Sequence, residues 1–104
     1  MRESVQKFSE AMETVLKEHD WKGGWEQEDF SYLWNRLLDE IEELKKQLER
    51  ARLLQTKEVI LSIPNKKLIN KEAVDVANFC MMIVDNVKYL DDEKESPNSP
   101  TNHF

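Results

Sequence analysis

The sequence predicts a small all-α protein, an antiparallel helical bundle that is completed by dimerisation. Two segments place apolar side chains at the three- and four-residue spacing of a helix, and a third stretch, residues 76–84, carries no charge. At 104 residues the chain is expected to form one domain, and a domain of this size buries only about two thirds of its unfolded surface. We therefore expect a partner subunit to supply part of the stability.

The first two helices are predicted on either side of a glycine turn. Residues 2–18 form an amphipathic stripe, and Gly23-Gly24 then interrupts the pattern with a backbone that is free to reverse direction. The second helix is expected from Phe30 to about Leu54, where the apolar residues keep the helical period. Asp29 or Ser31 is its expected N-cap.

The third helix is expected from about Leu68 to Leu90, with apolar residues around its whole circumference. A helix that is apolar all round is buried all round, so Cys80 is expected to be a small buried hydrophobe. Residues 55–67 are expected to form a partly buried connection before it. Residues 92–104 hold charges, serines and prolines without periodicity. The prediction is therefore one helical domain over residues 1–91 and a disordered tail over 92–104.

Composition narrows the classes of function. A net charge of −6 disfavours binding to a nucleic acid polymer. The longest uncharged apolar run is too short to cross a membrane, and the charged start lacks the apolar core of a secretory signal, so we expect a cytoplasmic protein. One cysteine excludes a disulfide framework and a thiolate zinc site within a single chain.

Two pairs of carboxylates stand out on the predicted helices. Glu40 and Glu43 are three residues apart at the border of the apolar stripe, and Glu72 and Asp75 repeat this spacing where the uncharged stretch begins. If the two helices pack antiparallel, the four carboxylates converge, and they repel one another unless a cation lies among them. Oxygen ligands favour Mg²⁺ or Mn²⁺ over Zn²⁺.

A simpler interpretation is open for the first pair. Glu-x-x-Glu occurs on many solvated helices, and the Lys45-Lys46 pair that follows Glu43 could make this side of the helix an ion-paired outer face. The pair at Glu72 and Asp75 is the more informative one, because it opens an otherwise uncharged stretch.

These motifs resemble the MazG-like family of all-α nucleoside triphosphate pyrophosphohydrolases, whose signature is Glu-x-x-Glu, a spacer, and Glu-x-x-Asp. Residues 40–43 and 72–75 carry the two halves, and the strings at residues 22–25 and 71–79 also look like this family. The resemblance covers roughly residues 18–86. One departure is Asp39, where family members often carry a glutamate, and it leaves the number of metal ions in doubt.

The resemblance implies hydrolysis of a nucleoside triphosphate between its α and β phosphates, with Mg²⁺, or Mn²⁺ as a substitute, and a homodimer or homotetramer. It assigns both the metal ligands and the catalytic groups to the motif carboxylates, and Asp39 could instead orient the attacking water. For Trp25, a proposed base contact, the alternative role is simple packing of the glycine turn. For Lys71, a proposed phosphate or sugar contact, the alternative is an ion pair with a neighbouring acid. The implied residues are Glu40, Glu43, Glu72 and Asp75 for metal and catalysis, Lys22, Lys71 and Asn78 for phosphate or sugar, and Trp25 and Phe79 for the base.

Two other functions remain open from the sequence. A non-catalytic helical module could bind a partner protein through Phe30, Trp34 and the Met81-Met82 patch. A dUTPase-like specialist of the same all-α superfamily would differ from the first hypothesis only in its substrate. Stabilisation by millimolar Mg²⁺ or Mn²⁺ separates a metal site from a solvated acidic face.

Overall fold

The computed structural model describes residues 1–20, 23–56 and 58–88, and within them it confirms the all-α prediction. The described residues form three helices and no strand: α1 (Glu3–Glu18), α2 (Phe30–Arg50) and α3 (Ile63–Val87). None of these helices combines the length and the apolar character needed to span a bilayer. The predicted disordered tail lies outside the described residues, and so does Lys22, a candidate contact for phosphate or sugar.

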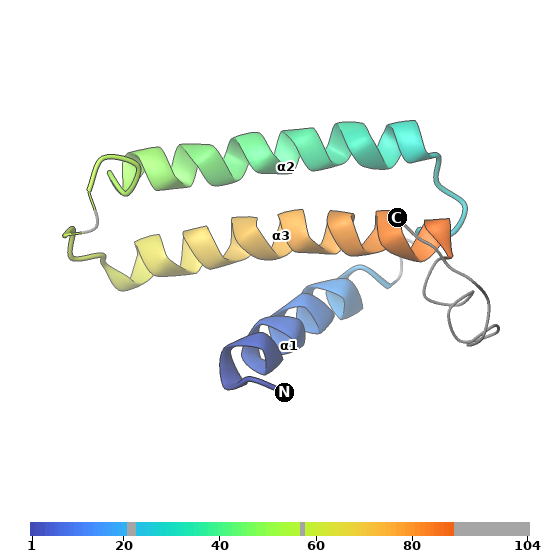
Figure 1. The fold of residues 1–104 in the computed structure, drawn as a ribbon, viewed down its shortest axis with the longest axis horizontal. Helices are drawn as coiled ribbons and strands as arrows, with labels where there is room; N and C mark the ends of the chain where they lie inside the picture. The colour runs from blue at the N-terminus through green and yellow to red at the C-terminus, as the bar shows by residue number, and fades with distance from the viewer. Residues whose placement is uncertain (21–22, 57, 89–104) are drawn as a thin grey trace, which may run out of the picture.

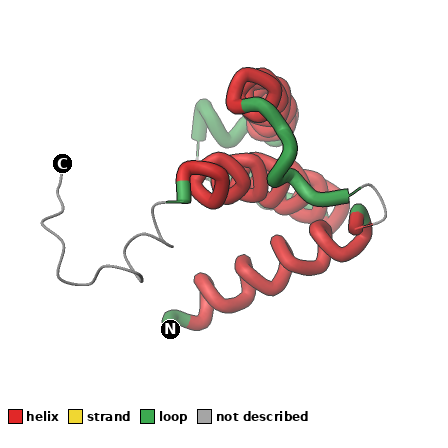
Figure 2. Tube along the Cα trace, turned by 90° about the vertical axis from the view of Figure 1, so that its right-hand side faces the viewer, coloured by secondary structure: helices red, strands yellow, loops and turns green. Residues whose placement is uncertain are grey.

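Helix α3 is the centre of the structure. It runs antiparallel to α2 along most of its length, and α1 packs obliquely against another side of α3 (Figures 1 and 2). The antiparallel pair predicted from the sequence is therefore present, and α3 is the helix that both neighbours contact. In the part of the chain that the structure describes, no helix covers the remaining long side of the α2 and α3 pair.

The buried core within the described residues is small. Its apolar members are Leu33 and Leu37 on α2, Ala51 just after α2, and Val74 on α3. Helix α1 contributes no buried residue. Because burial of apolar surface is the main favourable contribution to folding, the single chain has little apolar burial to offset its conformational entropy.

The prediction that α3 is buried all round is wrong for the single chain. Val84 and Val87 are exposed, and Cys80, predicted to be buried, is exposed as well. The physical reason is that, within the described residues, two helices pack against α3, so they cover two of its sides and leave a third, also apolar, uncovered.

Helix α3 begins at Ile63, earlier than the sequence predicts. The Ser62 side chain is the N-cap, and its hydroxyl oxygen accepts a hydrogen bond from the Asn65 N–H at 3.2 Å. Pro64 lies in the first turn, where its missing N–H has no helical partner to lose. The proline therefore starts this helix instead of separating it from the connection.

Helix α2 ends at Arg50, earlier than the sequence predicts, in a turn of the Schellman type. The Arg52 N–H donates to the Glu49 carbonyl at 2.9 Å, and the Leu53 N–H donates to the Leu48 carbonyl at 3.0 Å. Arg52 adopts φ +62°, a left-handed conformation that glycine usually takes. Helix α2 therefore ends in this turn without the glycine that usually occupies its left-handed position.

Replacing Arg52 with glycine is expected to stabilise the protein by about 0.5–1 kcal/mol, because it removes the penalty of a side chain in the left-handed region. Urea unfolding followed by circular dichroism measures the change. The matched control is Arg50→Gly inside the last turn of α2, which should destabilise by about 1 kcal/mol. A loss of stability in Arg52→Gly would contradict the assignment of this turn.

Candidate functional site

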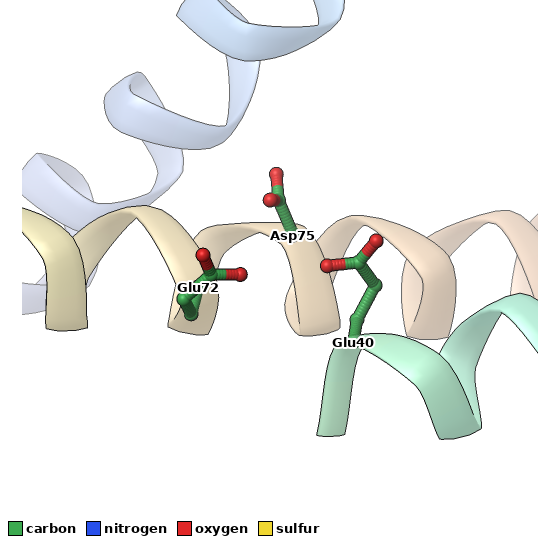
Figure 3. A group of neighbouring side chains, drawn as sticks. All are labelled: Glu40, Glu72 and Asp75. Atoms are coloured by element: carbon green, nitrogen blue, oxygen red, sulfur yellow. The ribbon is translucent and has the colours of Figure 1, made fainter. Parts of the chain in front are cut away.

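Three carboxylates converge between α2 and α3. Glu40 comes from the middle of α2, while Glu72 and Asp75 come from α3, and one oxygen from each lies within 4.8 Å of the others (Figure 3). Their side chains are only 13%, 10% and 20% exposed, respectively. Glu40 follows the buried Leu37 by three residues, so the helical period turns it toward α3.

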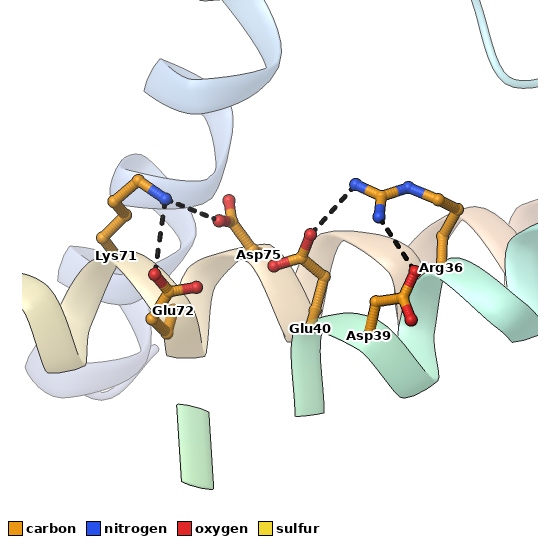
Figure 4. Close-up of polar contacts among 6 residues, drawn as sticks. All are labelled: Arg36, Asp39, Glu40, Lys71, Glu72 and Asp75. Carbon is orange, nitrogen blue, oxygen red and sulfur yellow. Dashed lines mark hydrogen bonds and ion pairs between the residues drawn. The ribbon is translucent and has the colours of Figure 1, made fainter. Parts of the chain in front are cut away.

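Two cations compensate part of this negative charge (Figure 4). Arg36 contacts Glu40 at 3.0 Å and the exposed Asp39 at 3.4 Å. Lys71 lies 3.2 Å from Asp75 and 3.5 Å from Glu72. The four carboxyl groups therefore share two positive charges, which leaves the cluster acidic.

Burial and mutual repulsion shift the ionisation of the cluster. The pKa of Glu40 is raised, first because burial disfavours its charged form and then because of the Asp75 charge, against a smaller lowering by Arg36. The pKa of Lys71 is also raised, chiefly by its hydrogen bond to Asp75. The surroundings therefore favour the neutral form of Glu40 and the charged form of Lys71.

Glu43 does not join the other three carboxylates. Its side chain is 48% exposed and lies 3.4 Å from Lys46 on the same helix. This ion pair matches the outer-face interpretation of the first motif as far as Glu43 is concerned, whereas Glu40 turns inward. The structure thus brings together three of the four candidate ligands, and Glu43 would have to leave Lys46 to become the fourth.

The donor set suits a hard divalent cation. Oxygen ligands bind Mg²⁺ at about 2.1 Å, so two of them are at most about 4.2 Å apart across one ion. The carboxylate oxygens of Glu40, Glu72 and Asp75 lie within 4.8 Å of one another. Small side-chain rotations would therefore close them around Mg²⁺ or Mn²⁺, and the residues fit such an ion.

A cavity of about 530 Å³ lies beside the carboxylates. It is open to solvent on one side and is lined by the C-terminal end of α1, the glycine turn, α2 and α3, and Glu40 and Asp75 form part of its wall. Three of the residues expected to contact substrate, Trp25, Asn78 and Phe79, line the same cavity. Lys71 lines a neighbouring pocket between α1 and α3, which also includes Asp75.

Trp25 attaches the glycine turn to the end of α3. Its indole N–H donates to Asp85 at 2.8 Å, and its carbonyl accepts from the Asn86 side chain at 3.0 Å. Gly23 in the same turn has φ +89°, a conformation that is unfavourable for any residue with a side chain. Trp25 therefore has the packing role that was its alternative assignment, and it also lines the cavity.

Asn78 is the most buried polar side chain on the cavity wall. The residue is 3% exposed and its amide nitrogen donates to the Met12 carbonyl of α1 at 3.3 Å. Its amide oxygen is buried and has no hydrogen-bond partner. A buried acceptor without a partner costs free energy, and because this oxygen has almost no exposed surface, a ligand would reach it only after the cavity wall moved.

Arg36 is a residue of the site that the sequence analysis did not assign. Besides its contacts with Glu40 and Asp39, its guanidinium carbon lies 5.2 Å from the centre of the Phe79 ring, and it lines the cavity. The signal that could have found it is its position four residues before Glu40, where an ion pair along one helix forms readily.

Comparison of the chain with models of known protein families, with curated proteins and with solved structures finds no match. The functional interpretation therefore depends on the motif resemblance and on the geometry of the cavity and its carboxylates.

The raised pKa of Glu40 predicts a pH dependence of stability in the absence of metal. The folded chain holds this proton more tightly than the unfolded chain, so the free energy of unfolding falls as the pH rises from about the ordinary value of 4.5 through the raised folded pKa. Wild type should lose stability relative to Glu40→Gln over this interval and then run parallel to it.

Urea unfolding at a series of pH values with a chelator present measures this difference. Glu42→Gln, on the exposed side of α2, is the control and should follow the wild-type curve. If Glu40→Gln showed the same pH dependence as wild type, burial of the Glu40 carboxyl group would have no energetic consequence.

Proposed function

We propose that this protein is a Mg²⁺-dependent nucleotide pyrophosphohydrolase that converts (deoxy)nucleoside triphosphates to the monophosphate and pyrophosphate. The observation that carries the proposal is the convergence of Glu40, Glu72 and Asp75 beside a cavity of about 530 Å³, which Glu40 and Asp75 line. Ligand cavities usually measure about 300–1,000 Å³, so a nucleotide fits. The motif resemblance supplies the reaction.

The roles of the acidic residues follow from their positions. Glu40, Glu72 and Asp75 would hold Mg²⁺, with Glu43 as a fourth ligand once it leaves Lys46. The bound ion would neutralise charge on the phosphates. In hydrolysis, water attacks the α phosphorus, the bond to the bridging oxygen breaks, pyrophosphate leaves, and a carboxylate accepts the proton of the water.

The rest of the cavity suits the nucleoside. Phe79 offers an aromatic face that Arg36 already contacts, and Trp25 lines the same cavity. The buried, partner-free Asn78 oxygen would accept from a sugar hydroxyl or a base N–H if the cavity wall moved to uncover it. Lys71 and Lys22 are the proposed phosphate contacts.

A second copy of the chain is the proposed cover for the uncovered side of α2 and α3. Phe30, Trp34, Leu38 and Ile41 recur at helical spacing along α2, and each is about half exposed. On helical wheels of an antiparallel pair they share one side with Cys80, Val84 and Val87, away from the carboxylates. We call these seven residues the apolar face.

The area of the apolar face is adequate for a dimer. Its exposed side chains amount to roughly 500 Å² of apolar surface, and a standard interface buries about 800 Å² on each partner once neighbouring atoms are included. Because the core of the single chain is small, burial of the apolar face in a dimer would contribute a large part of the free energy of unfolding. Phe30 and Trp34 of this face would contact a partner protein if the chain were a non-catalytic module, and activity measurements separate the two functions.

The direct test is a hydrolysis screen over ribo- and deoxynucleoside triphosphates with Mg²⁺ or Mn²⁺, in which pyrophosphate and phosphate are measured separately. Pyrophosphate release is the expected product, and a strong preference for dUTP would identify the dUTPase-like specialist. No turnover on any nucleotide with either metal would refute the proposal and favour the interaction module.

Asp75→Asn is expected to lower kcat at least about a hundredfold, because it removes a charged ligand of the metal ion that would neutralise the reacting phosphate. Glu43→Gln should have an effect of the same kind if the ligand set has four members, and its neighbour Glu42→Gln, which is exposed and outside the motif, should retain wild-type turnover. Circular dichroism checks that each variant keeps its helices. Full activity in Asp75→Asn would disprove the site.

Trp34→Arg is expected to convert the dimer to a monomer, since it places a charge in the apolar face. Sedimentation equilibrium measures the mass, and the rate of Cys80 labelling by a thiol reagent measures whether the face is covered. Val5→Arg, at an exposed apolar position on α1, is the control and should remain dimeric. A wild-type monomer with rapidly labelled Cys80 would contradict the proposal.

A further inference from the structure

Lys71 already occupies part of the space where the carboxylates would receive a cation. Its ammonium group lies 3.2 Å from Asp75 and 3.5 Å from Glu72, so one positive charge contacts two of the three converging groups (Figure 4). Arg36 contacts the third, Glu40, at 3.0 Å. The acidic cluster is thus compensated from within the chain, by residues that are adjacent or four positions away in sequence.

We propose that Lys71 is a resident counter-cation, which a divalent ion must displace and which therefore sets the affinity of the site for metal. This inference rests on the proposed metal site, and it adds a control on the filling of that site. It assigns Lys71 a positioning role toward the carboxylates, which precedes any contact with substrate.

The competition follows from distance. An ion bonded to Asp75 at about 2.1 Å would lie within about 5 Å of the ammonium group if Lys71 kept its present contact. Repulsion between the ion and the ammonium at this range opposes metal binding. The metal ion and the ammonium group also compete for the same oxygens of Asp75 and Glu72, so each one weakens the contacts of the other with these carboxylates.

Lys71 is the cation that can leave. Its side chain is 62% exposed and ends in a single charge on a flexible stem, so rotation into solvent disrupts only its two ion pairs. Arg36 is 38% exposed and is held by Glu40, by Asp39 and by the Phe79 ring. Of the two compensating charges, Lys71 is therefore the one that metal displaces.

A resident counter-cation differs measurably from an ordinary surface ion pair. An ordinary pair stabilises the fold by the same amount with and without metal. A displaced lysine stabilises only the metal-free fold, because its contacts are already lost in the metal-bound protein. Removing the charge of Lys71 should therefore destabilise the metal-free chain and tighten metal binding, two effects that linkage requires to be equal and opposite.

The experiment compares wild type with Lys71→Met, which keeps the apolar stem without the charge, and Lys71→Arg, which keeps the charge. Isothermal titration with Mn²⁺ measures affinity, and thermal unfolding with a chelator or with saturating Mn²⁺ measures stability. Lys7→Met is the matched control, because Lys7 pairs with Glu3 on α1 at 2.8 Å, in a pair four residues apart like that of Lys71 with Asp75.

Lys71→Met is expected to bind Mn²⁺ about five- to tenfold more tightly than wild type, the size expected for losing two partly exposed pairs. It should melt at a lower temperature with chelator and equal wild type at saturating Mn²⁺. Lys71→Arg and Lys7→Met should bind Mn²⁺ as wild type does.

Unchanged or weaker Mn²⁺ binding by Lys71→Met would overturn the inference, and so would an equal loss of stability with and without metal. If no variant and no wild-type protein binds Mn²⁺, the metal site and this inference fail together. If Lys71→Met binds Mn²⁺ more tightly but wild type hydrolyses no nucleotide, the inference stands and the proposed activity fails.

Discussion

The packing of α2 against α3 forces three partly buried carboxylates to face one another, and the rest of the structure is arranged around that unfavourable constraint. Burial removes water from Glu40, Glu72 and Asp75, while their proximity adds repulsion. Arg36 and Lys71 reduce the cost because each lies within four residues of the acids that it pairs with. Four carboxyl groups and two cations still leave the cluster with net negative charge.

The two long sides of the helix pair have different properties. The carboxylates and the cavity lie toward α1 and the glycine turn, where Trp25 and Asn78 tie these segments to α3. The apolar face lies on the other side, where nothing in the described chain covers it. Contacts on one side can therefore stabilise the fold without placing atoms in the cavity on the other.

Periodicity was sufficient to predict the helices and their antiparallel packing, because apolar spacing decides which face of a helix is buried. The helix ends were less predictable: Arg52 takes a conformation normally given to glycine, and Ser62 caps a helix whose first turn contains Pro64. Of the four carboxylates, three converge as spacing predicts. Spacing could not place Glu43, since a pair with Lys46 is equally compatible with the same sequence. The prediction for Cys80 was wrong because the apolar pattern of a helix indicates that its surface is unfavourable in water, but it does not indicate whether residues of the same chain pack against that surface.

Stability and site chemistry oppose each other in this chain. Replacing the acids by neutral residues would relieve repulsion and desolvation, yet it would remove the only group of converging oxygens in the described residues. The small core cannot absorb such a cost easily, since only Leu33, Leu37, Ala51 and Val74 form its apolar part. A ligand that binds only the folded state adds to its stability by mass action. A cation at the carboxylates and a second copy on the apolar face would contribute in this way independently, because they occupy opposite sides of α2 and α3. On this proposal the metal-free single chain would be the least stable form, and binding of a cation and of a second copy would offset the cost of keeping the acidic site.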